Sequence, residues 1–273
     1  MIRDKANQVA LSERLDDVLI ERSDFTAFAP GRTALNFGRF EYKYLVPESV
    51  RRRLEDAVSQ HMVLDSYCAG MPESRYSIRS VYFDDRKFSC YHEKIDGLLN
   101  RRKFRVRAYG ANAATIFLEE KGRRNAFSYK QRAVIPPDLY GPVLRADWKT
   151  LLAQLPGDSR VWECFISAGM RAVLRPTVRV DYMRRAYVNN SGYRFRVTFD
   201  SGLRAVQSAD LQDRGARSRP VHPGMTVVEI KFESQIPLWF IRLVEANSLQ
   251  RISISKYCVC AEALELVAGE DPV

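Results

Sequence analysis

The sequence lacks the cysteine and histidine patterns from which disulfide scaffolds and zinc sites are built. Its five cysteines are scattered, with only Cys258 and Cys260 close together, and no CxxC pair occurs. This odd number and wide spacing argue against a disulfide framework and fit a reducing cytosol. The three histidines, His61, His92 and His222, do not have the spacing of metal ligands.

Several other common signals are missing. No glycine-rich phosphate loop followed by Lys-Ser or Lys-Thr occurs, which excludes a P-loop enzyme, and no GxSxG motif of a serine hydrolase occurs. The apolar run from Ile236 to Val244 is too short to span a bilayer and is interrupted by Arg242. The N-terminal residues carry charges throughout, without the apolar core of a signal peptide. A soluble, cytoplasmic protein is therefore expected.

Positive charge, by contrast, is abundant. Among 273 residues, 43 Lys and Arg stand against 33 Asp and Glu, which gives a formal net charge of +10. Such an excess favours a polyanionic partner, such as nucleic acid, anionic lipid, nucleotide or another phosphate compound, without deciding among them. With 46% hydrophobic residues, a chain of this length can also bury a large core.

The cations follow the alternation of β-strands. Residues 101–109 read RRKFRVRAY, so Arg101, Lys103, Arg105 and Arg107 would share one face of a strand and apolar residues the other. Similar alternation predicts strands at 39–44, 115–121, 127–134, 177–188, 193–200 and 227–233. Helices are expected at 47–62, through much of 136–172, at 236–247 and at 256–267. Residues 203–223 are polar and predict a loop.

Two sheet architectures fit this pattern. In the simpler one, an open antiparallel sheet turns its polar face to water. In the other, the sheet closes into a barrel, the charged faces line the lumen and amphipathic helices cover the apolar outside. The dominance of Arg and Lys at the polar positions favours the second. Cations crowded in a lumen repel one another and need an anion of comparable charge, such as a polyphosphate chain.

The motifs that carry this alternation resemble the VTC (vacuolar transporter chaperone) polyphosphate polymerase domain, a branch of the triphosphate tunnel metalloenzyme superfamily. The resemblance extends from about Phe37 to Glu265. In chain order the motifs are RFEYKYLV (39–46), RSVYFDD (79–85), RRKFRVRAY (101–109), FLEEK (117–121), YKQR (129–132), YMRRAY (182–187), RVTFD (196–200), VVEIKF (227–232) and SKY (255–257). The implied fold class is α+β: a closed antiparallel tunnel of eight β-strands covered by amphipathic helices.

The resemblance also implies site residues. The catalytic set would be Lys43, Arg105, Arg107, Arg196 and Lys256. Phosphate or substrate would be bound by Lys121, Lys130, Arg132, Tyr182, Arg184 and Lys231. Mn²⁺ or Mg²⁺ would be held by Glu229, with Glu41 and Glu119 as further candidates. For each residue a structural or solvent-facing role is the alternative.

One departure from the superfamily pattern bears on the reaction. Its triphosphate hydrolases and class IV adenylate cyclases usually open with ExExK, whereas this segment reads Arg39-Phe40-Glu41-Tyr42-Lys43. Losing the first carboxylate weakens the case for a second metal ion that would activate water. Arg39, which stands in place of that carboxylate, adds a positive charge and so favours the binding of a longer anion. The departure therefore favours transfer to a phosphate acceptor over hydrolysis.

The expected function is metal-dependent polyphosphate synthesis, in which the γ-phosphate of ATP is transferred to a growing inorganic polyphosphate chain. A tripolyphosphatase or nucleoside triphosphatase of the same fold, and a non-catalytic polyphosphate-binding module, remain open. ATP, polyphosphate and pyrophosphate are the expected partners, and nucleic acid is not expected. A membrane-protein partner in trans, which would make the protein peripheral to a membrane, also remains open. The expected organisation is a helical extension (1–35), a single tunnel domain (36–267) and a tail (268–273).

Overall fold

The computed structural model describes residues 40–111, 113–125, 127–155, 159–189 and 194–267. The chain divides into two units, Met1–Asn36 and Phe37–Val273, and all described residues belong to the second. The predicted helical extension, the tail and Arg39 lie outside the described residues. Within those residues no helix is long and apolar enough to cross a membrane.

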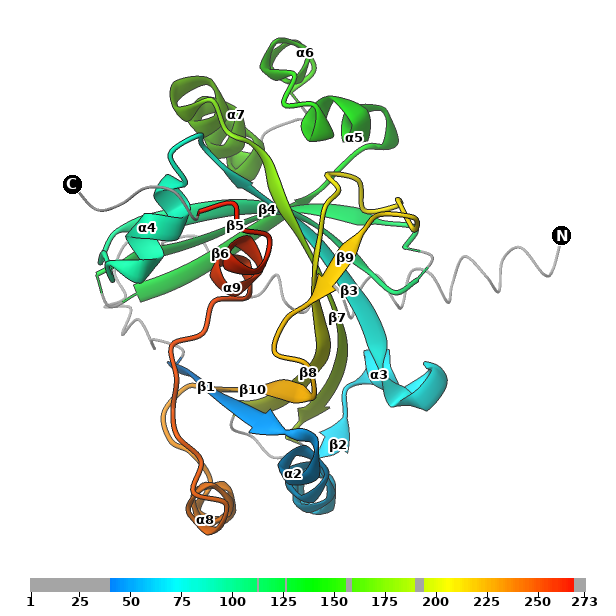
Figure 1. Cartoon of the computed structure of the whole chain (residues 1–273), viewed down its shortest axis with the longest axis vertical. Coiled ribbons are helices and arrows are strands. Elements are labelled where there is room, and N and C mark those ends of the chain that lie inside the picture. Colours follow the sequence, from blue (N-terminus) through cyan, green and yellow to red (C-terminus); the bar gives the residue numbers. More distant parts are fainter. Residues whose placement is uncertain (1–39, 112, 126, 156–158, 190–193, 268–273) are drawn as a thin grey trace, which may run out of the picture. The chain divides into compact units, whose positions relative to one another are not determined.

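A single antiparallel sheet of ten strands organises the described part of the chain (Figure 1). Eight strands follow one another in the order β1-β10-β8-β7-β3-β4-β5-β6, while β2 pairs with β7 and β9 pairs with β8. The strands are β1 (Phe40–Pro47), β2 (Val63–Leu64), β3 (Tyr76–Asp84), β4 (Arg101–Tyr109), β5 (Ile116–Arg124), β6 (Phe127–Val134), β7 (Arg175–Val188), β8 (Phe195–Val206), β9 (Ser218–Pro220) and β10 (Met225–Phe232).

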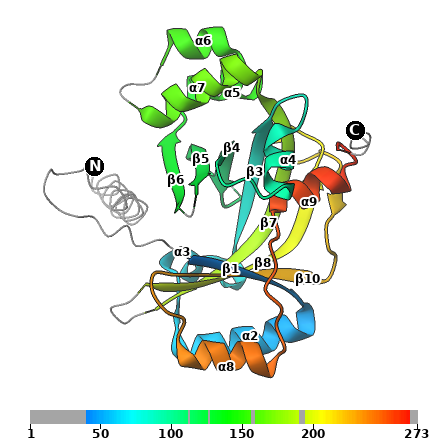
Figure 2. The same ribbon diagram turned by 90° about the vertical axis from the view of Figure 1, so that its left-hand side faces the viewer.

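The sheet curls so that its two ends face each other. Strands β3, β7 and β8 form the middle, and β4–β6 lie opposite β1 and β10 (Figures 1 and 2). Side chains connect the two ends, since Lys121 Nζ of β5 lies 3.3 Å from Glu41 Oε2 of β1. We call the concave, charged surface the inner face.

The antiparallel α+β fold class predicted from the sequence is confirmed, but the sheet differs from the expected closed cylinder of eight strands. It has ten strands, and within the described residues no backbone ladder joins β1 to β6. The edge of β1 pairs instead with the segment that leads to the last helix: Ile252 N–H donates to Lys43 O (2.8 Å) in an isolated antiparallel bridge. The backbone groups that would close the ladder are therefore partly used by another segment.

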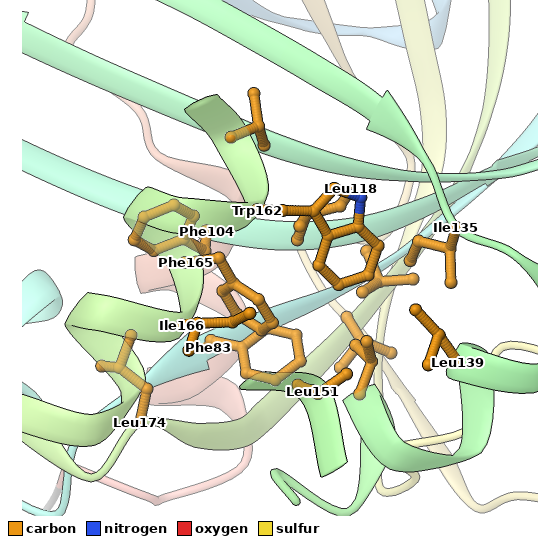
Figure 3. Close-up of a cluster of buried hydrophobic side chains, with 14 of the residues drawn as sticks. Phe83, Phe104, Leu118, Ile135, Leu139, Leu151, Trp162, Phe165, Ile166 and Leu174 are labelled. Atoms are coloured by element: carbon orange, nitrogen blue, oxygen red, sulfur yellow. The ribbon is translucent and has the colours of Figure 1, made fainter. Parts of the chain in front are cut away.

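Helices cover the apolar outer face in two groups (Figure 2). Helices α2 (Glu48–His61) and α8 (Leu238–Ala246) pack on β1, β8 and β10, while α5 (Pro137–Leu144), α6 (Trp148–Ala153) and α7 (Arg160–Ala172) pack near β4–β6. In the second group Trp162 and Phe165 of α7 contact the outward side chains of Phe83, Phe104 and Leu118 (Figure 3). The predicted alternation thus gives the sheet an apolar outer face on which amphipathic helices pack.

The last helix lies on the inner side of the curl. Helix α9 (Lys256–Ala263) packs Tyr257, Cys258 and Cys260 against Val178 and Val180 of β7. Further along the same face of β7 stand Tyr182 and Arg184, where the surface becomes polar. Helix α9 therefore fills one part of the inner face and leaves its first residue, Lys256, next to the charged part. The remaining short helices are α3 (Ser66–Ala69), η2 (Pro72–Ser74) and α4 (Ser89–Ile95).

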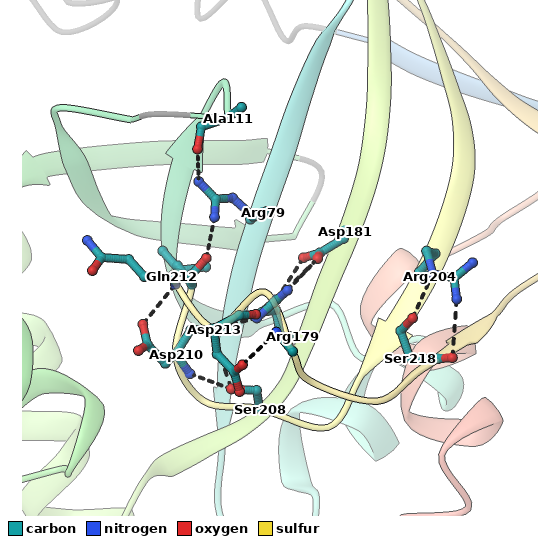
Figure 4. A network of polar contacts seen from close by, with 12 residues as sticks. Arg79, Ala111, Arg179, Asp181, Arg204, Ser208, Asp210, Gln212, Asp213 and Ser218 are labelled. Atoms are coloured by element: carbon teal, nitrogen blue, oxygen red, sulfur yellow. Dashed lines mark hydrogen bonds and ion pairs between the residues drawn. The ribbon is translucent and has the colours of Figure 1, made fainter.

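The predicted loop at 203–223 is partly wrong. β8 continues through Val206 and β9 adds a short strand, so the loop is limited mainly to residues 207–217. Two outward-facing arginines anchor it (Figure 4): Arg179 donates to Asp210 O and Asp213 O (both 2.7 Å), and Arg79 donates to Leu211 O. These arginines have a structural role.

Candidate functional site

The strand register brings the predicted site residues onto one surface. Residues directly opposite each other in a sheet share a face. The register pairs Lys43 with Glu229, Glu41 with Lys231, Arg196 with Lys231 and Arg105 with Glu119. The same face continues through the neighbouring pairs Asp200–Arg184, Ser80–Arg107, Lys103–Lys121, Lys121–Lys130 and Glu119–Arg132. With Lys256 from α9, every residue of the predicted set therefore lies on or beside the inner face.

Glu119 is the centre of a first cluster. Its fully buried carboxylate accepts hydrogen bonds from Arg105 Nε (2.7 Å) and Tyr109 OH (3.2 Å) and lies 3.0 Å from Lys130 Nζ. Arg107 Nη1 is 3.8 Å away, and Arg107 Nε donates to Ser80 Oγ (2.9 Å). Glu119 thus holds cations in position, and these contacts fit an ion-pairing role better than metal ligation.

The cations also set the charge of Glu119. Burial raises the pKa of its carboxyl, but Arg105, Lys130 and Arg107 outweigh burial and hold the pKa well below the usual range. The hydroxyl of Tyr82, which accepts from Arg105 Nη1 (3.0 Å), responds to the same cations. Burial raises the pKa of Tyr82, yet Arg105 and Arg107 lower it to about 8. The cluster is therefore strongly electropositive despite the carboxylate at its centre.

Asp200 organises a second cluster. Its buried carboxylate accepts a fork of hydrogen bonds from Arg184 Nε (2.6 Å) and Nη2 (2.7 Å), and Lys256 Nζ lies 2.7 Å away. Arg184 and Lys256 both lie over the ring of Tyr182, at 5.5 and 5.0 Å from its centroid. Burial raises the pKa of Asp200, but Arg184 and Lys256 outweigh it and the pKa falls below the ordinary value. The charged alternation of β8 includes Asp200, but the predicted site did not.

A lattice of lysines and glutamates connects β1, β10 and β5. Glu41 lies 3.0 Å from Lys43 Nζ and 3.3 Å from Lys121 Nζ, and Lys231 Nζ lies 3.2 Å from Glu229. Burial and Glu229 raise the pKa of Glu41, but Lys121 and Lys43 outweigh them and lower it to about 2. Glu41 raises the pKa of Lys121, but burial and Lys43 lower it to about 8.

Two further residues of the predicted set also have contacts outside the two clusters. Arg196 Nη2 lies 2.8 Å from the carboxylate of Asp65, which caps the short helix α3. The guanidinium of Arg132 lies 5.0 Å from the ring centroid of Phe117. Both residues share the inner face, because Arg196 lies directly opposite Lys231 and Arg132 lies directly opposite Glu119.

Carboxylates balance more of the charge than the sequence pattern suggested. The hypothesis that only a bound anion could offset the crowded cations is too strong, because Glu41, Glu119, Asp200 and Glu229 each pair with one or more of them. Cations nevertheless outnumber these carboxylates on the inner face. The positions are Lys43, Lys103, Arg105, Arg107, Lys121, Lys130, Arg132, Arg184, Arg196, Lys231 and Lys256. The excess favours an anionic ligand.

The predicted metal ligand Glu229 has a second oxygen donor beside it. Thr198 lies directly opposite Glu229, and its buried Oγ1 has no hydrogen-bond partner in the described part of the chain. Within that part no group of three His, Cys, Asp or Glu side chains could hold a metal. Mg²⁺ is commonly bound by one or two carboxylates together with substrate phosphates. These residues therefore fit a cation shared with a phosphate ligand rather than one held by the protein alone.

Asp200→Asn tests the second cluster. Arg184 and Lys256 would stay charged and buried without their carboxylate, so we expect the free energy of unfolding at pH 7 to fall by about 3–5 kcal/mol. The measurement is urea denaturation. Asp56→Asn, on the exposed surface of α2, is the matched control and should change the free energy by no more than about 0.5 kcal/mol.

The same pair of proteins gives a pH test. Because the folded pKa of Asp200 is depressed, its stabilisation is complete above the unfolded pKa and is lost as the pH falls through the folded pKa. The difference in stability between wild type and Asp200→Asn should therefore shrink below about pH 4. A difference that stays constant from neutral to acidic pH would contradict this role of Asp200.

Comparison with known proteins adds two relationships by sequence. Residues 38–265 match the family model of the VTC domain. The chain is also 24% identical over 230 residues to vacuolar transporter chaperone complex subunit 4 of Trypanosoma brucei brucei (strain 927/4 GUTat10.1). This match covers 71% of the present chain but only 29% of that relative's length.

Solved structures give more distant likenesses. A protein from Pyrococcus horikoshii OT3 has a TM-score of 0.41 and 12% identity, covering 82% of this chain and 98% of its own. A putative adenylyl cyclase from Hippeastrum, described as having a dominant triphosphatase activity, has a TM-score of 0.47 and 14% identity, covering 82% and 96%. A putative adenylate cyclase from Bacillus halodurans has a TM-score of 0.47 and 13% identity, covering 79% and 92%. Likenesses this weak carry no conclusion about this chain.

The family match is of a different kind, because it spans most of the sequence and includes the strands of the inner face. Its limits, residues 38 and 265, enclose β1 at one end and α9 at the other. The protein belongs to the VTC domain family.

Proposed function

We propose that the protein is a metal-dependent polyphosphate polymerase that transfers the γ-phosphate of ATP to a growing chain of inorganic polyphosphate. The observation that carries the proposal is the convergence of arginines and lysines on the inner face, where buried carboxylates fix them. Membership of the VTC domain family and the similarity to a vacuolar transporter chaperone subunit agree with a polyphosphate-related role.

We infer that the reacting phosphate would bind beside Tyr182. Arg184 and Lys256 lie over its ring, and its hydroxyl interacts electrostatically with Arg105 and Arg107 across the inner face. Arginine forks bind phosphate oxygens in pairs, and a lysine adds a point charge. A γ-phosphate held here would contact cations from β4, β7 and α9.

The fixed cations would do most of the catalytic work. Phosphoryl transfer depends mainly on positioning and on neutralising charge. Because Glu119 and Asp200 already hold Arg105, Arg184 and Lys256, little reorganisation would be needed as charge develops in the transition state. A divalent cation held by Glu229 and the phosphate oxygens would supply further charge neutralisation.

The protonation states of the carboxylates favour transfer over hydrolysis. Glu41 has a pKa of about 2, and neighbouring cations hold the pKa of Glu119 and Glu229 well below the usual range. Such carboxylates are weak general bases toward water. The terminal phosphate of a polyphosphate chain is already ionised and needs no base. Its oxygen would attack the γ-phosphorus, and ADP would leave with the electron pair of the broken P–O bond.

The family relationship also bears on the cellular setting. The relative in Trypanosoma brucei brucei carries the name of a complex subunit, and this chain covers 29% of its length. We propose that the protein acts on the cytoplasmic side of a membrane through a membrane-protein partner in trans. ATP and inorganic polyphosphate would be its substrates.

Arg107→Lys tests the proposed reaction. The wild-type protein, incubated with ATP and Mn²⁺, should form acid-stable phosphate chains visible on a gel. The variant keeps the charge but loses the guanidinium fork, so the rate of synthesis should fall about 100-fold or more. Lys149→Gln, at an exposed position of α6, should retain the wild-type rate.

The outcomes separate the candidate functions. Orthophosphate release without chain growth would indicate a hydrolase, and phosphate binding without turnover would indicate a binding module. Wild-type synthesis by Arg107→Lys would remove Arg107 from the proposed site. Urea denaturation of both variants checks that a loss of rate does not come from unfolding.

Glu229→Gln tests the proposed metal ligand. Loss of the charged oxygen should raise the Mn²⁺ concentration for half-maximal synthesis by about ten-fold or more. Glu163→Gln, on the exposed surface of α7, removes the same charge far from any proposed ligand and should leave the Mn²⁺ requirement unchanged. An identical Mn²⁺ dependence in wild type and Glu229→Gln would rule out this ligand.

A further inference from the structure

The inner face continues beyond the two clusters toward the start of β4, where like charges lie directly opposite each other. Lys103 of β4 is paired in register with Lys121 of β5, and Arg101 is paired with Arg123. Lys121 is in turn opposite Lys130 of β6. Like charges in directly opposed positions destabilise a sheet. The pair of Arg101 and Arg123, and Lys103 beside it, therefore call for an explanation other than fold stability.

Lys121 and Lys130 have carboxylate partners in Glu41 and Glu119, but the protein compensates Arg101, Lys103 and Arg123 only weakly. Within the described residues no ion pair joins Arg101, Lys103 or Arg123 to a carboxylate. Arg101 Nη1 donates to Leu98 O, Arg123 Nε donates to Asn125 O (2.8 Å), and Lys103 Nζ lies 5.4 Å from the centroid of the Tyr257 ring. Backbone carbonyls and a ring therefore orient these side chains, while most of their N–H groups stay available.

One further cation and one carboxylate lie nearby. Lys94 of α4 donates from Nζ to Ser253 Oγ (2.8 Å). Glu93 is close enough to feel the charges of Lys103 and Arg101, yet burial and Asp84 keep its pKa above the ordinary value. Glu93 is one carboxylate beside the four cations Arg101, Lys103, Arg123 and Lys94, so the group keeps a net positive charge.

The cations of this region repel one another. Burial lowers the pKa of Arg101, and the neighbouring Arg123 lowers it further. Burial likewise lowers the pKa of Lys94, with added repulsion from Arg101, Lys103 and Lys43. Lys43, which belongs to the proposed catalytic set, is among the cations that repel Lys94, so this region and the catalytic region are close enough to interact electrostatically.

The distance along β4 separates this region from the reacting phosphate. Arg101 and Arg105 are four residues apart on the same strand face, which corresponds to roughly 13 Å between their Cα atoms. A single phosphate group held at Arg105 cannot also reach Arg101. A linear chain of several phosphates can follow the strand and contact both.

We propose that Arg101, Lys103, Arg123 and Lys94 form a subsite for the polyphosphate chain, and that the chain leaves the inner face past the start of β4 and the end of β5. The inference rests on the proposed function. It states in which direction the growing chain leaves the catalytic region. The repeated negative charge of the chain offsets the repulsion between the opposed cations, and its oxygens accept from their available N–H groups.

The test is a comparison of binding by chain length. Arg101→Gln/Arg123→Gln removes one opposed pair, and Lys149→Gln/Arg171→Gln removes two charges from exposed positions on α6 and α7. The probes are tripolyphosphate and inorganic polyphosphate of several tens of phosphates. The first variant should bind the long chain about ten-fold more weakly, with a shallower salt dependence. Its tripolyphosphate affinity should stay close to that of the wild type.

The control variant should bind both probes like the wild type. Equal weakening for both probes in Arg101→Gln/Arg123→Gln, or wild-type affinity for the long chain, would overturn the subsite. Because the double variant loses a repulsive pair, the urea concentration at its unfolding midpoint should not be lower than that of the wild type. If the midpoint falls, the single variant Arg123→Gln replaces the double variant. Its loss of long-chain affinity should be smaller, and an unchanged affinity would contradict the subsite.

Product length gives an independent second readout. With ATP and Mn²⁺, Arg101→Gln/Arg123→Gln should release shorter chains than the wild type, because the growing chain is held less firmly. Wild-type product length together with wild-type long-chain affinity would refute the subsite while leaving the polymerase proposal intact. A wild-type protein that makes no chains would refute the polymerase proposal, and the binding comparison would still decide whether this subsite exists.

Discussion

The pairing of buried carboxylates with arginines and lysines is the interaction on which the inner face depends. Glu119 holds Arg105 and Lys130, and Asp200 holds Arg184 and Lys256. Without these anions the curled sheet would bring many cations together in a poorly hydrated space, at a large cost in free energy. The carboxylates reduce that cost, fix the geometry of the cations and still leave an excess of positive charge. A phosphate ligand can supply the rest.

The face on which a residue lies decides its role more than its type does. Arg79 and Arg179 stand on the outer face of β3 and β7, where they bind carbonyls of the 207–217 loop. Arg107 and Arg184 stand on the inner face of neighbouring strands and pair with buried carboxylates. A one-residue change of register would exchange these sets. The packing of apolar residues under α2, α7 and α8 therefore protects the site by fixing the register.

Local alternation made much of this fold predictable. The motif RRKFRVRAY coincides with β4, and the strand predicted at 177–188 falls within β7, where the register shifts between Asp181 and Met183. The roles of Asp200, Thr198 and Tyr82 were missed because they depend on partners from distant segments. The open ladder between β1 and β6 depends likewise on Ile252, far along the chain, which pairs with Lys43. A sequence pattern tells which face a side chain occupies, but it does not identify the neighbours that only folding provides.

The central claim is that the inner face binds linear phosphate chains, and a crystal structure with tripolyphosphate tests it most directly. We expect electron density for the ligand beside Tyr182, with its oxygens within hydrogen-bonding distance of Arg105, Arg107, Arg184 and Lys256. Tripolyphosphate bound only to lysines and arginines outside the inner face, with Arg184 and Lys256 still paired to Asp200 and no ligand between the strands, would contradict it.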